Sequence, residues 1–296
     1  MKEKTARRKN TLGGWLLSAP YLVYTIVFFL IPLIWAFWLS TMDWNLMSNN
    51  RKFVGFDNFI KLFSDNRVKM AFINSYKYML AIVILCTVFS ILIAMIVHSL
   101  PQKVKGVAAV LLFIPYLTSG VAVSVIVKFF FSYNSSFNVW LRGMGMDVNW
   151  FKDPTVAFWI MIGIIVWKMS GYYALFVLSA LEGISEDVNE AAALDGCTGI
   201  RKFFRITLPM ILPTLITIVT LAAGLGFGIF TEPYLLTGGG PSLATTTWQL
   251  EIYNASFTQF QSGYGAAMAI ANAVQIFITI QILEYVMERF NKRFGC

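Results

Sequence analysis

The chain has 296 residues, of which 57% are apolar types and only 13% are charged. Soluble domains carry about 45–50% apolar and about 25% charged residues. A water-soluble chain of this size would therefore lack the polar side chains needed to cover its surface, and lipid must replace water around much of it. Composition excludes a soluble enzyme, a disordered chain and a secreted disulfide scaffold.

The formal net charge of +8 comes from Lys and Arg in short segments between apolar stretches, a distribution that membrane proteins use against anionic lipid. No basic stripe with interleaved aromatic residues is present, so we expect membrane lipid and no nucleic acid as a partner.

Residues that commonly build catalytic and metal sites are scarce. Cys86, Cys197 and Cys296 are far apart and show no CxxC spacing, which favours neither a disulfide framework nor a metal site. His98 is the only histidine, which argues against Ser-His-Asp triads and His-based zinc sites. The phosphate-binding pattern Gly-x-x-x-x-Gly-Lys-Ser/Thr is missing too. We expect no catalytic residue, no metal and no cofactor in this chain.

Six stretches are long enough to cross a bilayer as helices, because about 20 apolar residues at 1.5 Å each span a hydrocarbon layer of about 30 Å. They cover approximately 15–40, 78–100, 107–131, 156–181, 210–230 and 264–286. The first is too long for a signal peptide and has no A-x-A-like site after it, so we expect it to be a retained span. The sequence predicts an all-α, polytopic membrane protein.

The orientation follows from Lys and Arg in the connections. Thirteen lie on the side of both termini and seven on the opposite side, which places the termini in the cytoplasm of a cell membrane. The predicted division is a cytoplasmic tail (1–14), a six-helix transmembrane domain (15–288) and a second cytoplasmic tail (289–296).

Helix breakers interrupt three spans: Pro20 and Pro32 in the first, Pro115 in the third, and Gly224, Gly226 and Gly228 in the fifth. Such residues favour either bending with close packing or a kinked helix along a substrate path. Gly263, Ala267 and Ala271 recur every four residues on the sixth span, a small-residue face suited to tight helix contact.

The connection 182–208 between the fourth and fifth spans is long and has signals of order. Ser185 can cap a helix that has acidic residues in its first turn and three consecutive alanines beyond it. Gly196 can take a positive φ and end that helix, and a second short helix over 200–207 is expected to end at Pro209. The residues alone favour docking to a partner protein only slightly over a helix lying on the lipid surface.

Four motifs in this chain resemble motifs of a known protein family. EAAALDG at 190–196 with ITLP at 206–209 resembles the EAA loop of permease subunits in binding-protein-dependent ABC importers, where a Gly follows the last Ala of the motif by four residues. VGFDNF (54–59), YLLTGGGP (234–241) and GYGAA (263–267) resemble the carbohydrate branch of that family, and specifically its first-type, MalF-like subunit. Ser185, Asn189 and Cys197 depart from the usual loop residues, and loop 42–70 is too short for the extra outer domain of the maltose member.

The resemblance implies a type I ABC importer permease that takes up sugars, in particular oligosaccharides, by alternating access. Its partners would be a second homologous permease subunit, two ABC ATPase subunits that bind ATP and Mg, and an extracytoplasmic sugar-binding protein. The residues implied in ATPase coupling are Glu190, Ala191, Ala192, Asp195 and Gly196.

A sugar site needs aromatic faces and neutral polar groups. Along the spans, the candidates for substrate binding are Trp167, Tyr172, Phe227, Thr231, Glu232 and Gln275, with Tyr173 and Asn272 beside them. Lys168 is a charged residue within a span, a costly position that suggests contact with an acidic sugar, although long Lys chains also reach the interface.

Two other classes of protein compete with this interpretation. An ion-coupled secondary transporter of a small polar solute needs paired ionisable residues at mid-membrane, and this chain has few. An intramembrane enzyme needs a cluster of His, Cys or carboxylate groups, for which the sequence gives little support.

Overall fold

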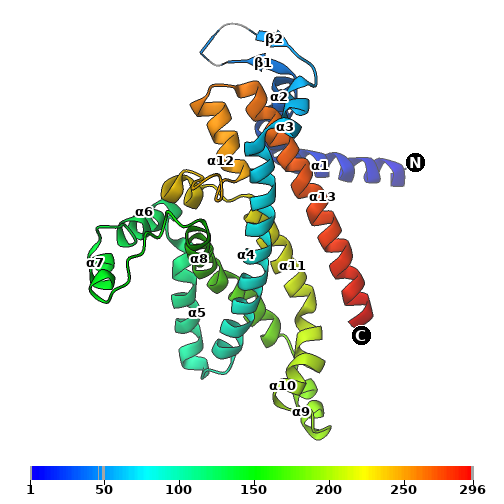
Figure 1. Ribbon diagram of the computed structural model, residues 1–296. Helices are drawn as coiled ribbons and strands as arrows, with labels where there is room; N and C mark the ends of the chain where they lie inside the picture. The colour runs from blue at the N-terminus through cyan, green and yellow to red at the C-terminus, as the bar shows by residue number, and fades with distance from the viewer. Residues whose placement is uncertain (1, 46, 49–50, 295–296) are drawn as a thin grey trace. The chain divides into compact units, whose positions relative to one another are not determined.

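The computed structural model describes residues 2–45, 47–48 and 51–294, and most of them are helical (Figure 1). Among the described residues, five helical segments are long and apolar enough to cross a membrane, and there are six if a bent helix pair is counted as one span. The five are Gly14–Ser40, Asn66–His98, Pro154–Glu182, Gly199–Phe227 and Ser262–Arg289. The prediction of an all-α, six-span chain is thereby confirmed.

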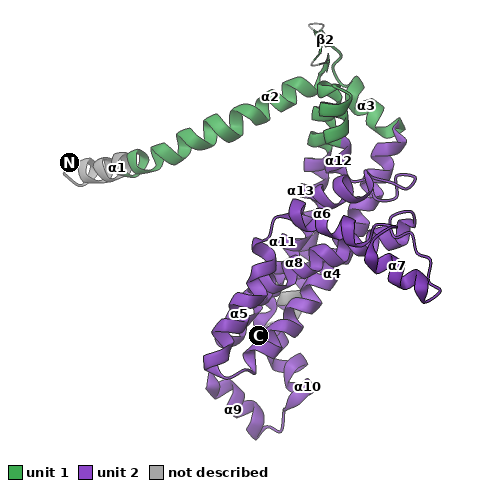
Figure 2. Ribbon diagram, turned by 90° about the vertical axis from the view of Figure 1, so that its left-hand side faces the viewer, with its two compact units in different colours: residues 1–64, 252–271 green, residues 65–251, 272–296 purple. Residues whose placement is uncertain are grey.

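The chain divides into two compact units, residues 1–64 with 252–271 and residues 65–251 with 272–296 (Figure 2). In the larger unit, α4 (Asn66–His98) packs along α8 (Pro154–Glu182) and α11 (Leu208–Phe227), while α5 (Gln102–Leu117) packs on α8. Their shared core includes the fully buried Tyr78, Ile82, Met161, Ile162 and Ile218.

Two glycines let backbones in this core approach closely. A Cβ added at Gly171 of α8 would lie 1.9 Å from the carbonyl oxygen of Leu112 in α5. One added at Gly226 of α11 would lie 2.5 Å from Cα of Met79 in α4. Gly226 was one of the predicted helix breakers, and close packing is the role that the structure gives it.

The third span differs from the predicted stretch 107–131, because it is not one helix. α5 ends at Leu117 and α6 (Gly120–Phe130) begins at an angle of 82° to it. Thr118 and Ser119 between them are extended, and the Ser119 hydroxyl accepts a hydrogen bond from the amide of Ala122, which caps α6. Ser119 therefore starts a new helix where hydropathy alone shows a continuous apolar stretch.

Two predicted boundaries were also wrong. α4 begins at Asn66, well before 78, because Asp65 caps it by accepting a hydrogen bond from the amide of Arg67 at 2.8 Å. α10 (Gly199–Lys202) and the π-helical segment η2 (Phe203–Thr207) run straight into α11, so Pro209 does not end a helix. The π turn widens the helix directly before the proline, which lacks an N–H and would clash in an ordinary α turn.

In the smaller unit, α1 (Lys2–Thr25), η1 (Ile26–Leu30) and α2 (Ile31–Ser40) contain the first span, Gly14–Ser40. Its apolar window buries no residue within the chain. An unpredicted hairpin of β1 (Met42–Trp44) and β2 (Arg51–Phe53) follows, with Met42 opposite Phe53, and then α3 (Asp57–Ser64). Residues 252–271 complete this unit with the end of α12 (Trp248–Tyr253), η4 (Asn254–Thr258) and the start of α13 (Ser262–Phe294).

The VGFDNF segment has a structural role in this unit. Asn58 donates hydrogen bonds to the carbonyls of Ser40 and Met42, at 2.8 and 3.0 Å. Gly263 is packed so tightly that an added Cβ would lie 1.8 Å from the Met42 carbonyl oxygen. The predicted small-residue face of the sixth span therefore meets backbone at its first position.

Candidate functional site

The loop between α8 and α11 has the helix and the turn expected from its sequence. α9 covers Glu186–Leu194, and its end is closed by hydrogen bonds from the amides of Gly196 and Cys197 to the carbonyls of Ala193 and Ala192. Gly196 has a φ of +67°, as predicted. This pair of bonds around a left-handed residue is the Schellman arrangement, which fixes the direction in which the chain leaves the helix. The Ser185 side chain makes no capping hydrogen bond.

Most of the predicted coupling residues lie on the surface of this loop. Glu190, Ala191, Asp195 and Gly196 are exposed, whereas Ala192 is buried within the chain. Leu194 in the same loop is 90% exposed. Figure 1 shows α9 and α10 together at one end of α11, beyond the ends of α4 and α5. The loop presents acidic groups and an apolar side chain to its surroundings, as docking surfaces do.

A second loop contains the TGGGP part of the YLLTGGGP motif (234–241) and is held by hydrogen bonds between its own residues. η3 (Pro233–Thr237) leads into it, and Gly238 and Gly239 have positive φ values. The Thr245 hydroxyl donates to the Gly240 carbonyl at 2.7 Å and lies 2.7 Å from the Thr237 hydroxyl. The glycine-rich sequence therefore serves a tight turn.

Residues that sequence analysis missed tie this loop to α4. The side-chain amide of Asn74 donates to the carbonyls of Leu243 and Thr246, at 2.9 and 3.0 Å. The Thr246 hydroxyl donates to buried Glu251 at 2.6 Å, and the Glu251 carboxylate lies 3.6 Å from the guanidinium of Arg67. A polar residue within an apolar helix is the signal that could have identified Asn74.

The predicted substrate residues do not form a single cluster. Phe227 is fully buried and meets Tyr76 edge-on at 5.3 Å. Gln275 is buried and accepts a hydrogen bond from the Trp248 indole at 2.6 Å. Tyr172 stacks on Tyr116 with ring centres 4.3 Å apart. These three side chains are thus engaged within the chain.

Thr231, in contrast, lies with Lys168 at the start of α6, and the charge of Lys168 acts on Glu232, the residue after Thr231. A Cβ added at Gly120 would lie 3.5 Å from Lys168 Nζ and 3.8 Å from Thr231 Cγ2. Glu232 is buried beyond the end of the Gly199–Phe227 span. Burial raises the pKa of its carboxyl, and the positive charge of Lys168 acts in the opposite direction.

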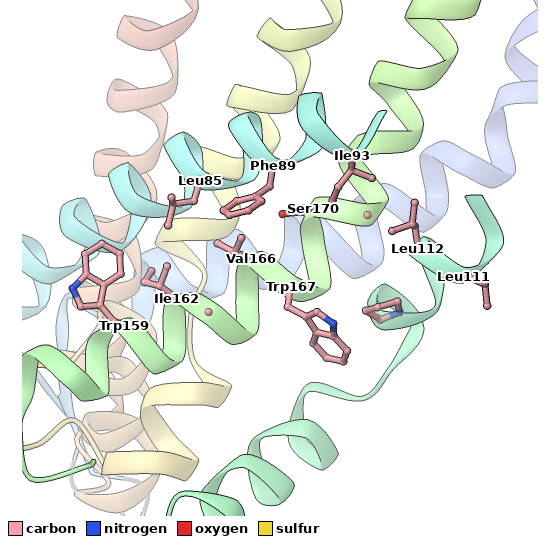
Figure 3. A pocket seen from close by; sticks show the side chains of 13 residues that line it. Leu85, Phe89, Ile93, Leu111, Leu112, Trp159, Ile162, Val166, Trp167 and Ser170 are labelled. Atoms are coloured by element: carbon pink, nitrogen blue, oxygen red, sulfur yellow. The ribbon is translucent and has the colours of Figure 1, made fainter. Parts of the chain in front are cut away.

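Trp167 lies apart from that group and lines a cavity of about 590 Å³ between α4, α5 and α8. Figure 3 shows Leu85, Phe89 and Ile93 of α4 facing Ile162 and Val166 of α8 across it. Ser170 supplies a hydroxyl in a lining that is otherwise almost all hydrocarbon. Binding of sugar hydroxyls needs several convergent polar groups, so this cavity is suited to an apolar ligand and not to a sugar.

Among the residues that the structure describes, no group of three or more His, Cys, Asp and Glu side chains is placed to hold a metal ion.

Comparison with known families decides the identity. A model of binding-protein-dependent transport system inner membrane components matches residues 88–293, which include the α9–α10 loop. The chain belongs to this family. It is a multi-pass membrane permease subunit, and the resemblance predicted from the EAA loop is confirmed. The two competing classes, a secondary transporter and an intramembrane enzyme, are thereby set aside.

Relatives match this permease over nearly its whole length. The sn-glycerol-3-phosphate transport system permease protein UgpA of Escherichia coli (strain UTI89 / UPEC) is 31% identical over 280 residues, covering 93% of this chain and 92% of UgpA. The multiple sugar-binding transport system permease protein MsmF of Streptococcus mutans serotype c is 29% identical over 292 residues, covering 96% and 97%.

A solved structure has the same fold. A chain of a bacterial ABC transporter involved in the import of the acidic polysaccharide alginate superposes with a TM-score of 0.81 at 24% identity, covering 97% of the permease and 98% of that chain. The likeness at this level of identity shows a shared fold.

Proposed function

We propose that this permease takes up sugars, in particular oligosaccharides, by alternating access driven by partner ATPases. The observation that carries the substrate class is the match to MsmF, a permease of a multiple sugar-binding transport system, over 96% of the chain. The fold shared with the alginate importer supports the same class.

Coupling to the ATPases is assigned to the α9–α10 loop, through Glu190, Ala191, Asp195 and Gly196, with Ala192 supporting the helix from inside. A helix made to lie on an anionic membrane surface carries Lys and Arg on its polar face. α9 carries Glu186, Asp187 and Glu190 and no basic residue. The negative charge of α9 therefore favours contact with a basic protein surface over contact with anionic lipid.

The complete importer would contain a second homologous permease, two ATPase subunits and an extracytoplasmic sugar-binding protein. ATP and Mg would bind to the ATPases, so that this chain itself hydrolyses nothing. The α9–α10 loop and both termini would lie in the cytoplasm, in agreement with the excess of Lys and Arg on that side.

For the substrate path, we group Thr231, Glu232 and Lys168, because Thr231 and Lys168 meet at the start of α6 beside the bend of the third span and the charge of Lys168 acts on Glu232. Trp167 and Tyr172 precede and follow Lys168 on α8. Phe227 and Gln275 would support the path from behind, through Tyr76 and Trp248.

The substrate class is tested by deleting the gene for this chain in its native host and measuring uptake of labelled oligosaccharides and of glycerol 3-phosphate. We expect loss of uptake of at least one oligosaccharide, restored by the wild-type chain, with glycerol 3-phosphate uptake unchanged. Loss of glycerol 3-phosphate uptake alone would contradict the assignment to sugars.

A further inference from the structure

A second cavity, of about 260 Å³, lies between the α9–α10 loop and the ends of two spanning helices. His98 comes from the end of α4, Asn189 from α9, Lys202 from α10 and Thr207 from the π segment that follows. We call it the loop pocket. A water molecule occupies about 30 Å³ in the liquid, so the loop pocket has room for a group several times larger.

Each polar residue that lines the loop pocket can donate a hydrogen bond, and Lys202 also carries a positive charge. In the described part of the chain, none of the side chains of His98, Asn189, Lys202 and Thr207 forms a hydrogen bond or an ion pair with another residue. No acidic residue is among those that line the pocket. Glu182, at the end of α8, is already paired with Lys105 at 3.0 Å. The pocket is therefore complementary to an anion.

The rest of the lining is apolar: Met95, Leu181, Ile184 and Phe203, with Gly199. Since α4 ends at His98 and α8 at Glu182, the pocket lies beside the ends of two helices that are long and apolar enough to span a membrane. Phosphodiesters of lipids lie at the level where such helices leave the membrane, and the cytoplasmic leaflet is rich in anionic lipid. A lining that is half donor and half apolar matches a lipid headgroup with its glycerol better than it matches a free ion.

We propose that the loop pocket binds the phosphodiester of an anionic phospholipid, with Lys202 as the charged partner and Asn189, His98 and Thr207 as further donors. The assignment to the cytoplasmic leaflet rests on the proposed orientation. Because these residues come from the α9–α10 loop and from α4, one headgroup joins the base of the loop to the end of a span. The bound lipid thereby holds the α9–α10 loop in a fixed position relative to the membrane-spanning helices.

The test uses the full-length wild-type chain purified in detergent and titrated with phosphatidylglycerol or phosphatidylcholine of identical acyl chains, with binding read by native mass spectrometry. We expect preference for phosphatidylglycerol. Lys202→Gln should lower that affinity about tenfold, the size of one lost charge-assisted hydrogen bond, and leave phosphatidylcholine binding unchanged. Asn189→Ala should also lower the affinity for phosphatidylglycerol. It provides a second variant if Lys202→Gln folds poorly.

Arg201 supplies the matched control, because it has the same charge, stands next to Lys202 and does not line the pocket. Arg201→Gln should change phosphatidylglycerol affinity by less than about twofold. Equal losses in both variants would mean diffuse attraction to a basic surface and would overturn the proposal. Displacement of phosphatidylglycerol by millimolar inorganic phosphate would also overturn it, because the pocket would then recognise a free anion. These outcomes do not depend on sugar uptake, so failure here is distinct from failure of the proposed function.

Discussion

Replacing Glu190 by Lys is expected to reduce uptake by the assembled importer by about a hundredfold or more. Glu190 is exposed on α9, directly before the alanines and the Schellman turn at Gly196. If the ATPase surface meets it with basic or donor groups, the substitution places like charges together within a desolvated contact. Losing one partner of such a contact costs roughly 2–5 kcal/mol. Uptake of labelled sugar in cells lacking the native copy measures the effect.

Asp187 provides the control for this substitution. It is an exposed acidic residue on the same helix, outside the EAAALDG segment. Asp187→Lys makes the same change of charge but lies outside the EAAALDG segment, so it should reduce uptake less than about threefold, through an unfavourable charge at the helix N-terminus and a weaker overall attraction to a basic surface. Wild-type uptake by Glu190→Lys, with the protein present in the membrane, would contradict the coupling role of α9.

The second large effect is expected at Gly171, where α8 and α5 touch through their backbones. A Cβ there would lie 1.9 Å from the Leu112 carbonyl oxygen, far inside contact distance. Gly171→Ala should therefore push α5 away from α8 and destabilise the larger unit by about 1–3 kcal/mol, the usual cost of overpacking. Thermal unfolding of the purified chain in detergent would show a lower midpoint.

Gly163 is the matched control, because it lies on the same helix and a Cβ added to it would meet no atom within 4 Å. Gly163→Ala should leave the unfolding midpoint unchanged or raise it, since alanine favours a helix interior by roughly 0.5–1 kcal/mol. If both variants unfold at the wild-type midpoint, the close approach of α5 and α8 is not a feature of the folded protein.

Hydropathy and local turn chemistry were enough to predict the spans and the α9 turn. The turn at Gly196 was predictable because it is local: an alanine-rich helix ending at a glycine specifies its own cap. The apolar stretches were predictable because length and hydropathy alone decide whether a helix can cross a bilayer.

Features that depend on particular polar side chains were not predictable in the same way. Pro115 indicated a breaker in the third span, but the place and sharpness of the break, where the Ser119 hydroxyl caps a new helix, are not registered by hydropathy. Asn74 escaped notice because the second span was expected to begin at 78, which placed it outside the membrane helix.

The substrate residues were chosen by residue type, without knowledge of which partners would engage them. Gln275 illustrates the limit, because its carbonyl oxygen accepts from Trp248, which comes 27 positions earlier in the chain. Pairings of this kind follow from how distant helices pack, so the sequence indicated polar residues near the path but not which of them are free to meet a substrate.

The measurement that tests the account most directly is copurification of the tagged, full-length chain from its native membrane after gentle solubilisation. We expect an ABC ATPase and a second six-span permease with the wild type. Gly196→Pro should lose the ATPase, because proline cannot adopt the φ of +67° found at this turn. Gly196→Asn should keep it, because asparagine tolerates that region. A wild-type chain that purifies alone, or only with copies of itself, would contradict the assignment of this protein as the permease subunit of an ATP-driven importer.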